Sequence, residues 1–250
     1  MTNSIKEIGN EKSKIKKRVK WIDVSRGLAF LMVIYSHLEF SNSTIMRYFS
    51  PVFLTTFFFV SGYLFKENHS FKYVFEQRTR TLLLPFISLG FIMIFMKQIF
   101  TLNEKISLTE GIKGLLFQNG TDQILWFIAA LYVYSIVFYW VEKFSKNPTN
   151  LLLLASFLFA INTLYTKITG GFDVPWHIES TGYACFYMGI GKYYKEKEEK
   201  LQKYFDNKYI ILLCSFVYIG LITYFNLHVS YSCGNYGIDA LLVTIPGIIL

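Results

Sequence analysis

Charged side chains are scarce in this sequence. They make up 17% of the 250 residues, whereas ordinary soluble domains contain about 25%. Hydrophobic residues reach 53% and aromatic residues 19%, more than the core of one soluble domain of this size could bury. This composition excludes a disordered chain, a collagen and a coiled coil. It predicts a membrane protein with several spans.

Cysteine is also rare, with Cys185, Cys214 and Cys233 as the three positions. They show no CxxC spacing and no nearby histidine, so we expect neither a disulfide framework nor a metal site. The net charge of +8 could indicate nucleic-acid binding, but the basic residues stand in short blocks between apolar runs. That distribution excludes nucleic acid as a partner and favours membrane lipids.

The N-terminal region lacks the features of a cleaved signal peptide. Residues 1–20 are polar and basic, no A-x-A site follows them, and Arg26 and His37 interrupt the next apolar stretch. We therefore predict a cytoplasmic leader over 1–20 and a membrane domain over 21–250.

Long apolar runs are the main feature of the membrane domain. A spanning helix needs about 20 mostly apolar residues, and this criterion predicts an all-α, polytopic transmembrane helix bundle with about eight membrane segments. The predicted segments are 23–43, 48–66, 81–100, 122–141, 149–165, 179–194, 208–227 and 237–250. Because the last segment stops in mid-span, we expect the chain to be truncated at its C-terminus.

The distribution of lysine and arginine predicts the orientation. Nineteen of the 25 basic residues fall in the leader and in the alternate loops 66–80, 142–148 and 192–208. Cytoplasmic loops carry such an excess, so the N-terminus is predicted to be cytoplasmic, in the plasma membrane. The 192–208 stretch is interpreted as a solvated linker.

The first apolar segment carries two ionisable groups, Arg26 and His37, which are eleven residues apart. In one continuous helix this spacing puts both on one face, with His37 roughly 16 Å deeper in the membrane. Asp23 shares that face, and Glu39 is interpreted as a solvated rim residue. Intramembrane ionisable groups are expensive and indicate function, although a snorkelling Arg26 and a hydrogen-bonded His37 are the structural alternatives.

Several motifs resemble, in order, those of the acyltransferase-3 family of integral membrane acyltransferases. The Arg-x10-His spacing lies in DVSRGLA at 23–29, followed by FFFVSGYLF at 57–65, RTRTLLLPF at 78–86 and LWFIAAL at 125–131. PWHI at 175–178 with FYMG at 186–189 looks closest to the fucose O-acetylase-like branch. The R-x-R spacing of the arginines departs from the R-x-x-R of many relatives.

The resemblance implies transfer of an acetyl group from acetyl-CoA, as a co-substrate, to a sugar hydroxyl of a cell-envelope polysaccharide or glycolipid. No bound cofactor and no metal are implied. His37 would act as general base or as a transient acyl carrier, and Arg26 would stabilise negative charge. Relatives have around ten membrane helices, so the expected truncation puts activity in question.

Four further residues are candidates for substrate binding: Arg78, Arg80, Ser61 and Trp126. The arginines could bind CoA phosphates through fork-shaped hydrogen bonds or anchor the cytoplasmic side. Ser61, with Gly62, could line the acyl path or mark close helix packing. Trp126 could form a stacking platform for a sugar or an interfacial anchor.

Other polar groups are interpreted as structural. Trp176 is predicted to be an interfacial anchor, and His177 and Glu179 are interpreted as interfacial decoration, with contact to an acceptor as the alternative. Two other functions remain open for the whole chain. They are a transporter or exporter of a sugar or lipid-linked glycan and a non-catalytic membrane protein that acts by interaction.

Overall fold

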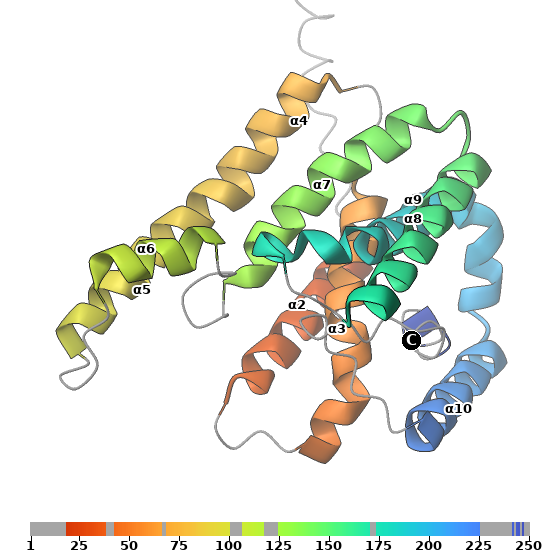
Figure 1. Ribbon diagram of the computed structural model, residues 1–250. Helices are drawn as coiled ribbons and strands as arrows, with labels where there is room; N and C mark the ends of the chain where they lie inside the picture. The colour runs from red at the N-terminus through yellow and green to blue at the C-terminus, as the bar shows by residue number, and fades with distance from the viewer. Residues whose placement is uncertain are drawn as a thin grey trace, which may run out of the picture.

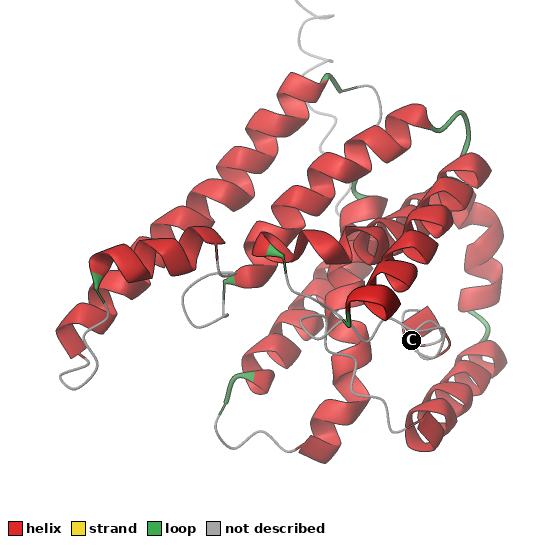
Figure 2. Cartoon of the chain, viewed as in Figure 1, coloured by secondary structure: helices red, strands yellow, loops and turns green. Residues whose placement is uncertain are grey.

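The computed structural model describes residues 19–38, 43–66, 69–100, 107–117, 125–170 and 174–225, together with residues 242, 244, 245 and 247. The described elements are all helical, and no strand occurs among them (Figures 1 and 2). The predicted all-α class is therefore confirmed. The leader 1–20, the eighth segment 237–250 and Cys233 lie wholly or largely outside the described residues.

The helices follow one another along the chain with short connections. Their bounds are α2 Lys20–Ser36, α3 Ser43–Tyr63, α4 Phe71–Arg78, the π-helical turn η1 Thr79–Leu83, α5 Leu84–Phe100, α6 Leu108–Phe117, α7 Trp126–Phe144, α8 Pro148–Thr169, the 3-10 turn η3 Pro175–Ser180, α9 Thr181–Phe205 and α10 Lys208–Phe225.

Four described helices are long and apolar enough to cross a membrane, namely Thr44–Tyr63, Phe71–Phe100, Trp126–Phe144 and Pro148–Thr169. The pair Pro175–Phe205 and Lys208–Tyr224, bent by 94°, could form a fifth span. The four helices fall on the second to fifth predicted segments, and the sixth and seventh predicted segments together form the bent pair. The total of about eight spans and the cytoplasmic N-terminus stay predictions.

Three predicted boundaries are wrong. The predicted 66–80 loop is helical from Phe71, and α4, η1 and α5 form one helix of 30 residues. The 192–208 stretch is not a linker, because α9 continues to Phe205. The first predicted segment, 23–43, is shorter in the structure, since α2 ends at Ser36.

Helix α8 shows how local sequence sets the helix ends. The side chain of Asn147 accepts a hydrogen bond from the backbone N–H of Asn150 at 2.8 Å, and Pro148 occupies the first turn, where its missing N–H costs nothing. At the other end Gly170 adopts a left-handed conformation, with φ 69°. Glycine allows that conformation without strain, so the turn to η3 begins there.

Helix α9 is the centre of the bundle, and its glycines allow this position. A Cβ on Gly191 would overlap the carbonyl of Phe59 in α3, and a Cβ on Gly182 would overlap that of Leu158 in α8. From α3, a Cβ on Gly62 would overlap the carbonyl of Met188. Small residues at helix crossings let membrane helices approach closely, so α9 packs backbone to backbone against both α3 and α8.

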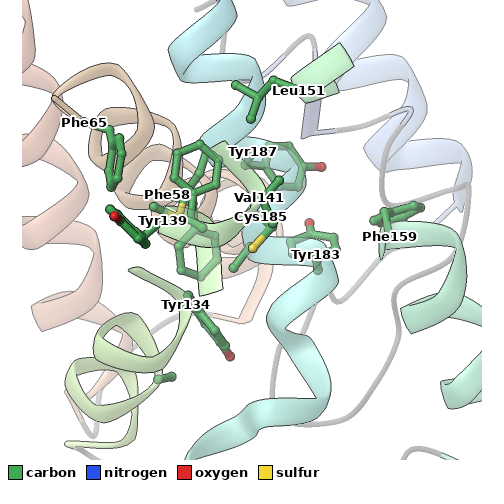
Figure 3. Packing of buried hydrophobic residues seen from close by; sticks show 14 of the residues in the cluster. Phe58, Phe65, Tyr134, Tyr139, Val141, Leu151, Phe159, Tyr183, Cys185 and Tyr187 are labelled. Atoms are coloured by element: carbon green, nitrogen blue, oxygen red, sulfur yellow. The ribbon is translucent and has the colours of Figure 1, made fainter. Parts of the chain in front are cut away.

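An aromatic core fills the space between α3, α7, α8 and α9. Tyr134, Tyr183 and Tyr187 are fully buried there, beside Phe58 and Cys185 (Figure 3). Tyr183 and Tyr187 lie one turn apart on α9, with ring centroids 4.8 Å apart. This cluster explains where part of the unusual aromatic content is used, and it leaves α2 and α10 at the periphery of the bundle.

The helix formed by α4, η1 and α5 projects beyond the rest of the bundle, and α6 folds back along α5 (Figure 1). Gly90 of α5 faces Leu115, and Gly111 of α6 faces Ile94. The two glycines therefore allow the short α6 to pack closely against α5. This arm contacts the bundle through α7 and η3.

Candidate functional site

Helix α2 carries Arg26 and His37 on its exposed side. Ile22 and Ala29 face inward and are buried, whereas Arg26 and His37 are exposed. The structure does not place His37 inside a continuous helix. It follows the last helical residue, Ser36, and its backbone N–H donates to the carbonyl of Ile34 at 3.1 Å. The shared face of Arg26 and His37, which was predicted for one continuous helix, therefore stays a prediction.

The neighbouring side of α2 forms one wall of a cavity of about 1050 Å³. The other walls come from α3, α9 and α10, together with residues 245 and 247. Ser25, Ala29 and Met32 line this cavity, while Arg26 and His37 are not among its lining residues. Arg26 follows Ser25 directly in α2, so it lies about 100° around the helix from this lining residue.

The described lining of this cavity is apolar along most of its length and acidic at one end. Glu198 of α9 and Asp206, which follows α9, are the charged lining residues, and no lysine or arginine lines it in the described part of the chain. Glu198 accepts a hydrogen bond from the hydroxyl of Tyr63 at 2.8 Å. Because its two carboxylates repel a negatively charged phosphate, the cavity suits an apolar or hydroxyl-rich group better.

The two arginines lie on a different part of the bundle. Arg78 ends α4 and Arg80 lies in the π-helical turn η1, which packs against α7, where the Thr79 and Tyr132 hydroxyls lie 3.3 Å apart. Arg80 is exposed. Arg78 is half-buried, and its Nε atom is buried with no hydrogen-bond partner among the described residues. The contacts of these helices do not bring the arginines together with Arg26 and His37 on α2.

Ser61 lies on α3 and is half-buried. Its neighbour Gly62 meets the backbone of Met188 directly, so close helix packing, the structural alternative for this pair, is confirmed for Gly62. A role of Ser61 in substrate binding stays a prediction.

Trp126 and His177 lie together, which the sequence did not predict. Trp126 begins α7 and is half-buried. Its ring centroid lies 4.6 Å from that of His177 in η3, with the ring planes at 70°. The same His177 is tied to α7 a second time, since the hydroxyl of Tyr134 donates to its backbone carbonyl at 2.8 Å.

The interpretation of His177 and Glu179 as interfacial decoration is wrong. Their side chains are only 3% and 5% exposed, and Nδ1 of His177 lies 2.9 Å from Oε1 of Glu179. The other carboxylate oxygen of Glu179 accepts a hydrogen bond from the backbone N–H of Val174 at 3.1 Å. A buried carboxylate needs such compensation, so Glu179 belongs to the internal structure of the segment.

The backbone around this pair is strained. Trp176 and His177 both have positive φ angles, 58° and 51°, which cost on the order of 1–3 kcal/mol for each residue other than glycine. Trp176 is half-buried and packs edge to face on Phe86, with centroids 6.0 Å apart, and its role as an interfacial anchor stays a prediction. Tryptophan does not favour this conformation, although histidine is enriched in it among residues other than glycine. The kink was not predicted from the motif PWHI.

The described residues contain no group of three His, Cys, Asp or Glu side chains that could hold a metal ion. Cys185 is buried and Cys214 half-buried, and both are free thiols. The candidate chemistry of the described chain consequently lies in three places: the exposed side of α2 with the adjoining cavity, the arginines at η1, and the Trp126–His177–Glu179 group.

Comparison with known proteins identifies the family. A family model described as an acyltransferase domain, Acyl_transf_3, matches residues 19–250. No curated protein and no solved structure matched the chain. The family match covers all the helices described above, including α2 with Arg26 and His37. The chain therefore belongs to the acyltransferase-3 family and is a membrane acyltransferase.

Proposed function

We propose that the protein transfers an acetyl group from acetyl-CoA to a sugar hydroxyl of a cell-envelope polysaccharide or glycolipid. Its family supports acyl transfer, and its apolar helices support catalysis at a membrane, for which we propose the plasma membrane with a cytoplasmic N-terminus. The motif PWHI with FYMG favours the fucose O-acetylase-like branch, and hence a sugar as acceptor. No bound cofactor or metal is required by this reaction.

The donor half of the proposal rests on one observation, the buried Nε atom of Arg78. A half-buried guanidinium without a hydrogen-bond partner at Nε, among the residues described, is unfavourable unless an anion approaches it. It stands at the π-helical turn η1, and such turns frequently occur at functional sites. With the exposed Arg80 beside it, Arg78 would bind the phosphates of CoA through fork-shaped hydrogen bonds.

The acceptor half of the proposal uses the cavity and Trp126. Because the described cavity lining has no cation and one acidic end, it suits the acceptor better than the phosphates of the donor. Carboxylates such as Glu198 accept hydrogen bonds from hydroxyl groups. Ser61 and Trp126 are not among the residues that line this cavity. We propose that they contact the acceptor beyond it, Trp126 by stacking its half-buried ring against a sugar.

His37 and Arg26 would carry the chemistry. His37 takes the proton from the acceptor hydroxyl while the oxygen attacks the thioester carbonyl. The C–S bond then breaks, and CoA leaves as a thiolate that is protonated to the thiol. Arg26 stabilises the negative charge that develops on the carbonyl oxygen or on the donor. In the alternative route His37 itself attacks the thioester and passes the acetyl group on to the acceptor.

The test is release of free CoA from acetyl-CoA by the purified protein in detergent or lipid, with and without envelope glycans. We expect turnover by the parent protein and its loss in His37→Ala. A matched control is His69→Ala, because His69 stacks on Tyr73 away from the candidate site. Equal turnover in the parent protein and His37→Ala would refute the role of His37. Solute flux that needs no acetyl-CoA would favour a transporter instead.

A further inference from the structure

Polar contacts of one side chain, Glu179, hold the segment 174–180 in place. Glu179 uses both of its carboxylate oxygens inside this segment, one on the imidazole of His177 and one on the backbone N–H of Val174. The carboxylate therefore closes a loop around Trp176 and His177, the two residues in the left-handed conformation. Removing it would release both ends of the kink.

Helix α7 contacts the same kink at two points. Trp126 packs against the imidazole ring, and Tyr134, eight residues later, binds the backbone carbonyl of His177. Eight residues correspond to about 12 Å along a helix, so the two contacts of His177 lie about two turns apart on α7. The imidazole is consequently fixed between the carboxylate of Glu179 and the indole of Trp126.

Simple packing does not require this arrangement. Glycine or asparagine at positions 176 and 177 would form the same turn with less strain, and an apolar side chain would fill the space without burying a charge. Strained backbone that is held by its surroundings concentrates at binding and catalytic sites. Precise sites also depend on residues that lock the rotamers of the groups that touch the ligand.

We propose that His177 and Glu179 are positioning residues that fix the orientation of Trp126 for binding the acceptor sugar. The inference rests on the proposed function, in which the indole of Trp126 stacks against that sugar. Glu179 holds the imidazole by its Nδ1 atom, which sets the ring plane, and the ring plane in turn blocks rotation of the indole. His177 acts through Trp126 and does not touch the reacting atoms.

Steady-state kinetics distinguish this positioning role from a catalytic role and from a general loss of folded structure. The variants are Glu179→Gln, which removes the charge, and His177→Asn, which removes the ring but tolerates the left-handed backbone. In both we expect KM for the acceptor to rise about five- to tenfold, with KM for acetyl-CoA and kcat within about twofold of the parent values. Glu199→Gln is the matched control, since Glu199 is an exposed carboxylate of α9.

A second measurement does not depend on activity. The near-ultraviolet circular dichroism of Trp126 is obtained as the difference between a protein and its Trp126→Phe variant. A fixed indole gives a strong signal, so this difference should be clear in the parent protein and in Glu199→Gln, and should fall by at least half in Glu179→Gln and His177→Asn.

Each possible failure has a distinct meaning. Absence of acetyl-CoA turnover in the parent protein contradicts the proposed function, while the circular dichroism still tests whether Glu179 orders Trp126. An unchanged Trp126 signal, or an unchanged acceptor KM in an active Glu179→Gln protein, overturns the positioning role. A fall in kcat at saturating acceptor with an unchanged acceptor KM also overturns it, because His177 would then act in the chemistry.

Discussion

His177 and Glu179 form a buried pair, 2.9 Å apart, although one residue alone separates them in the chain. In a regular helix, side chains two residues apart do not face each other. The left-handed conformations of Trp176 and His177 turn the imidazole toward the carboxylate. Backbone strain and side-chain pairing are thus two aspects of one feature, and each depends on the other.

The hydrogen bond between Tyr134 and the carbonyl of His177 should stabilise the kink. Tyr134→Phe removes a buried hydrogen bond and is expected to lower the free energy of unfolding by about 1 kcal/mol. Thermal unfolding in detergent measures this change. Tyr209→Phe is a suitable control because Tyr209 is 70% exposed, and equal losses in both variants would contradict the prediction.

Close packing of α3 on α9 should depend on Gly62. In Gly62→Ala the new methyl group would overlap the carbonyl of Met188, which is backbone and cannot rotate away. We expect a loss of about 3 kcal/mol or more, or failure to accumulate folded protein. The measurement is the yield of monodisperse protein together with its thermal unfolding.

The matched control for that change is Gly220→Ala in α10, where nothing lies within 4 Å of the new Cβ. This substitution should be neutral or slightly stabilising, since alanine favours helix over glycine. Tolerance of alanine at both positions would show that α3 and α9 lie farther apart than the structure has them.

Asn162 should act as a cap for α9 from a neighbouring helix. Its side-chain oxygen accepts hydrogen bonds from the backbone N–H groups of Gly182 and Tyr183, at 3.1 and 3.4 Å. These are first-turn donors that lack partners within their own helix. Asn162→Ala is expected to cost about 1–3 kcal/mol, as measured by chemical or thermal unfolding.

The corresponding control lies on the same helix. Ser156 is exposed and bonds the carbonyl of Leu152 within α8, so Ser156→Ala should change stability by less than about 0.5 kcal/mol. A loss for Asn162→Ala no larger than this would show that the cap contributes nothing measurable.

Arg78 should control the affinity for the donor. In Arg78→Gln the positive charge is lost, and KM for acetyl-CoA should rise about tenfold or more, because hydrogen bonds to charged groups are stronger than neutral ones. Arg78→Lys keeps the charge but loses the fork-shaped geometry and should give an intermediate value. CoA release as a function of acetyl-CoA concentration provides the measurement.

Lys72→Gln is the control for Arg78, since Lys72 is 86% exposed and lies two turns earlier on α4. A donor KM that is unchanged in Arg78→Gln would remove this arginine from the donor site. The unpaired Nε atom would then need an acceptor from the residues outside the described ranges.

The helical class and the membrane location followed from the sequence alone. Apolar runs such as 48–66 and 149–165 match helices α3 and α8 closely, because burial in a bilayer demands about 20 apolar residues and satisfied backbone groups. The order of several motifs, of which the spacing of Arg26 and His37 is the first, indicated the family that the comparison then showed. Hydropathy did not predict α4. This helix continues into the apolar α5, but its own residues are of mixed polarity and form no apolar run.

The sequence determined most of the apolar helices and the family, because hydropathy and motif order are local properties of the chain. The tertiary structure alone decided which polar groups are buried and what they face. No local pattern shows that α7 supplies Trp126 and Tyr134 to one histidine of η3, or that Glu179 is buried against it. These relationships arise from long-range packing around α9 and from a strained backbone that only the surrounding helices hold in place.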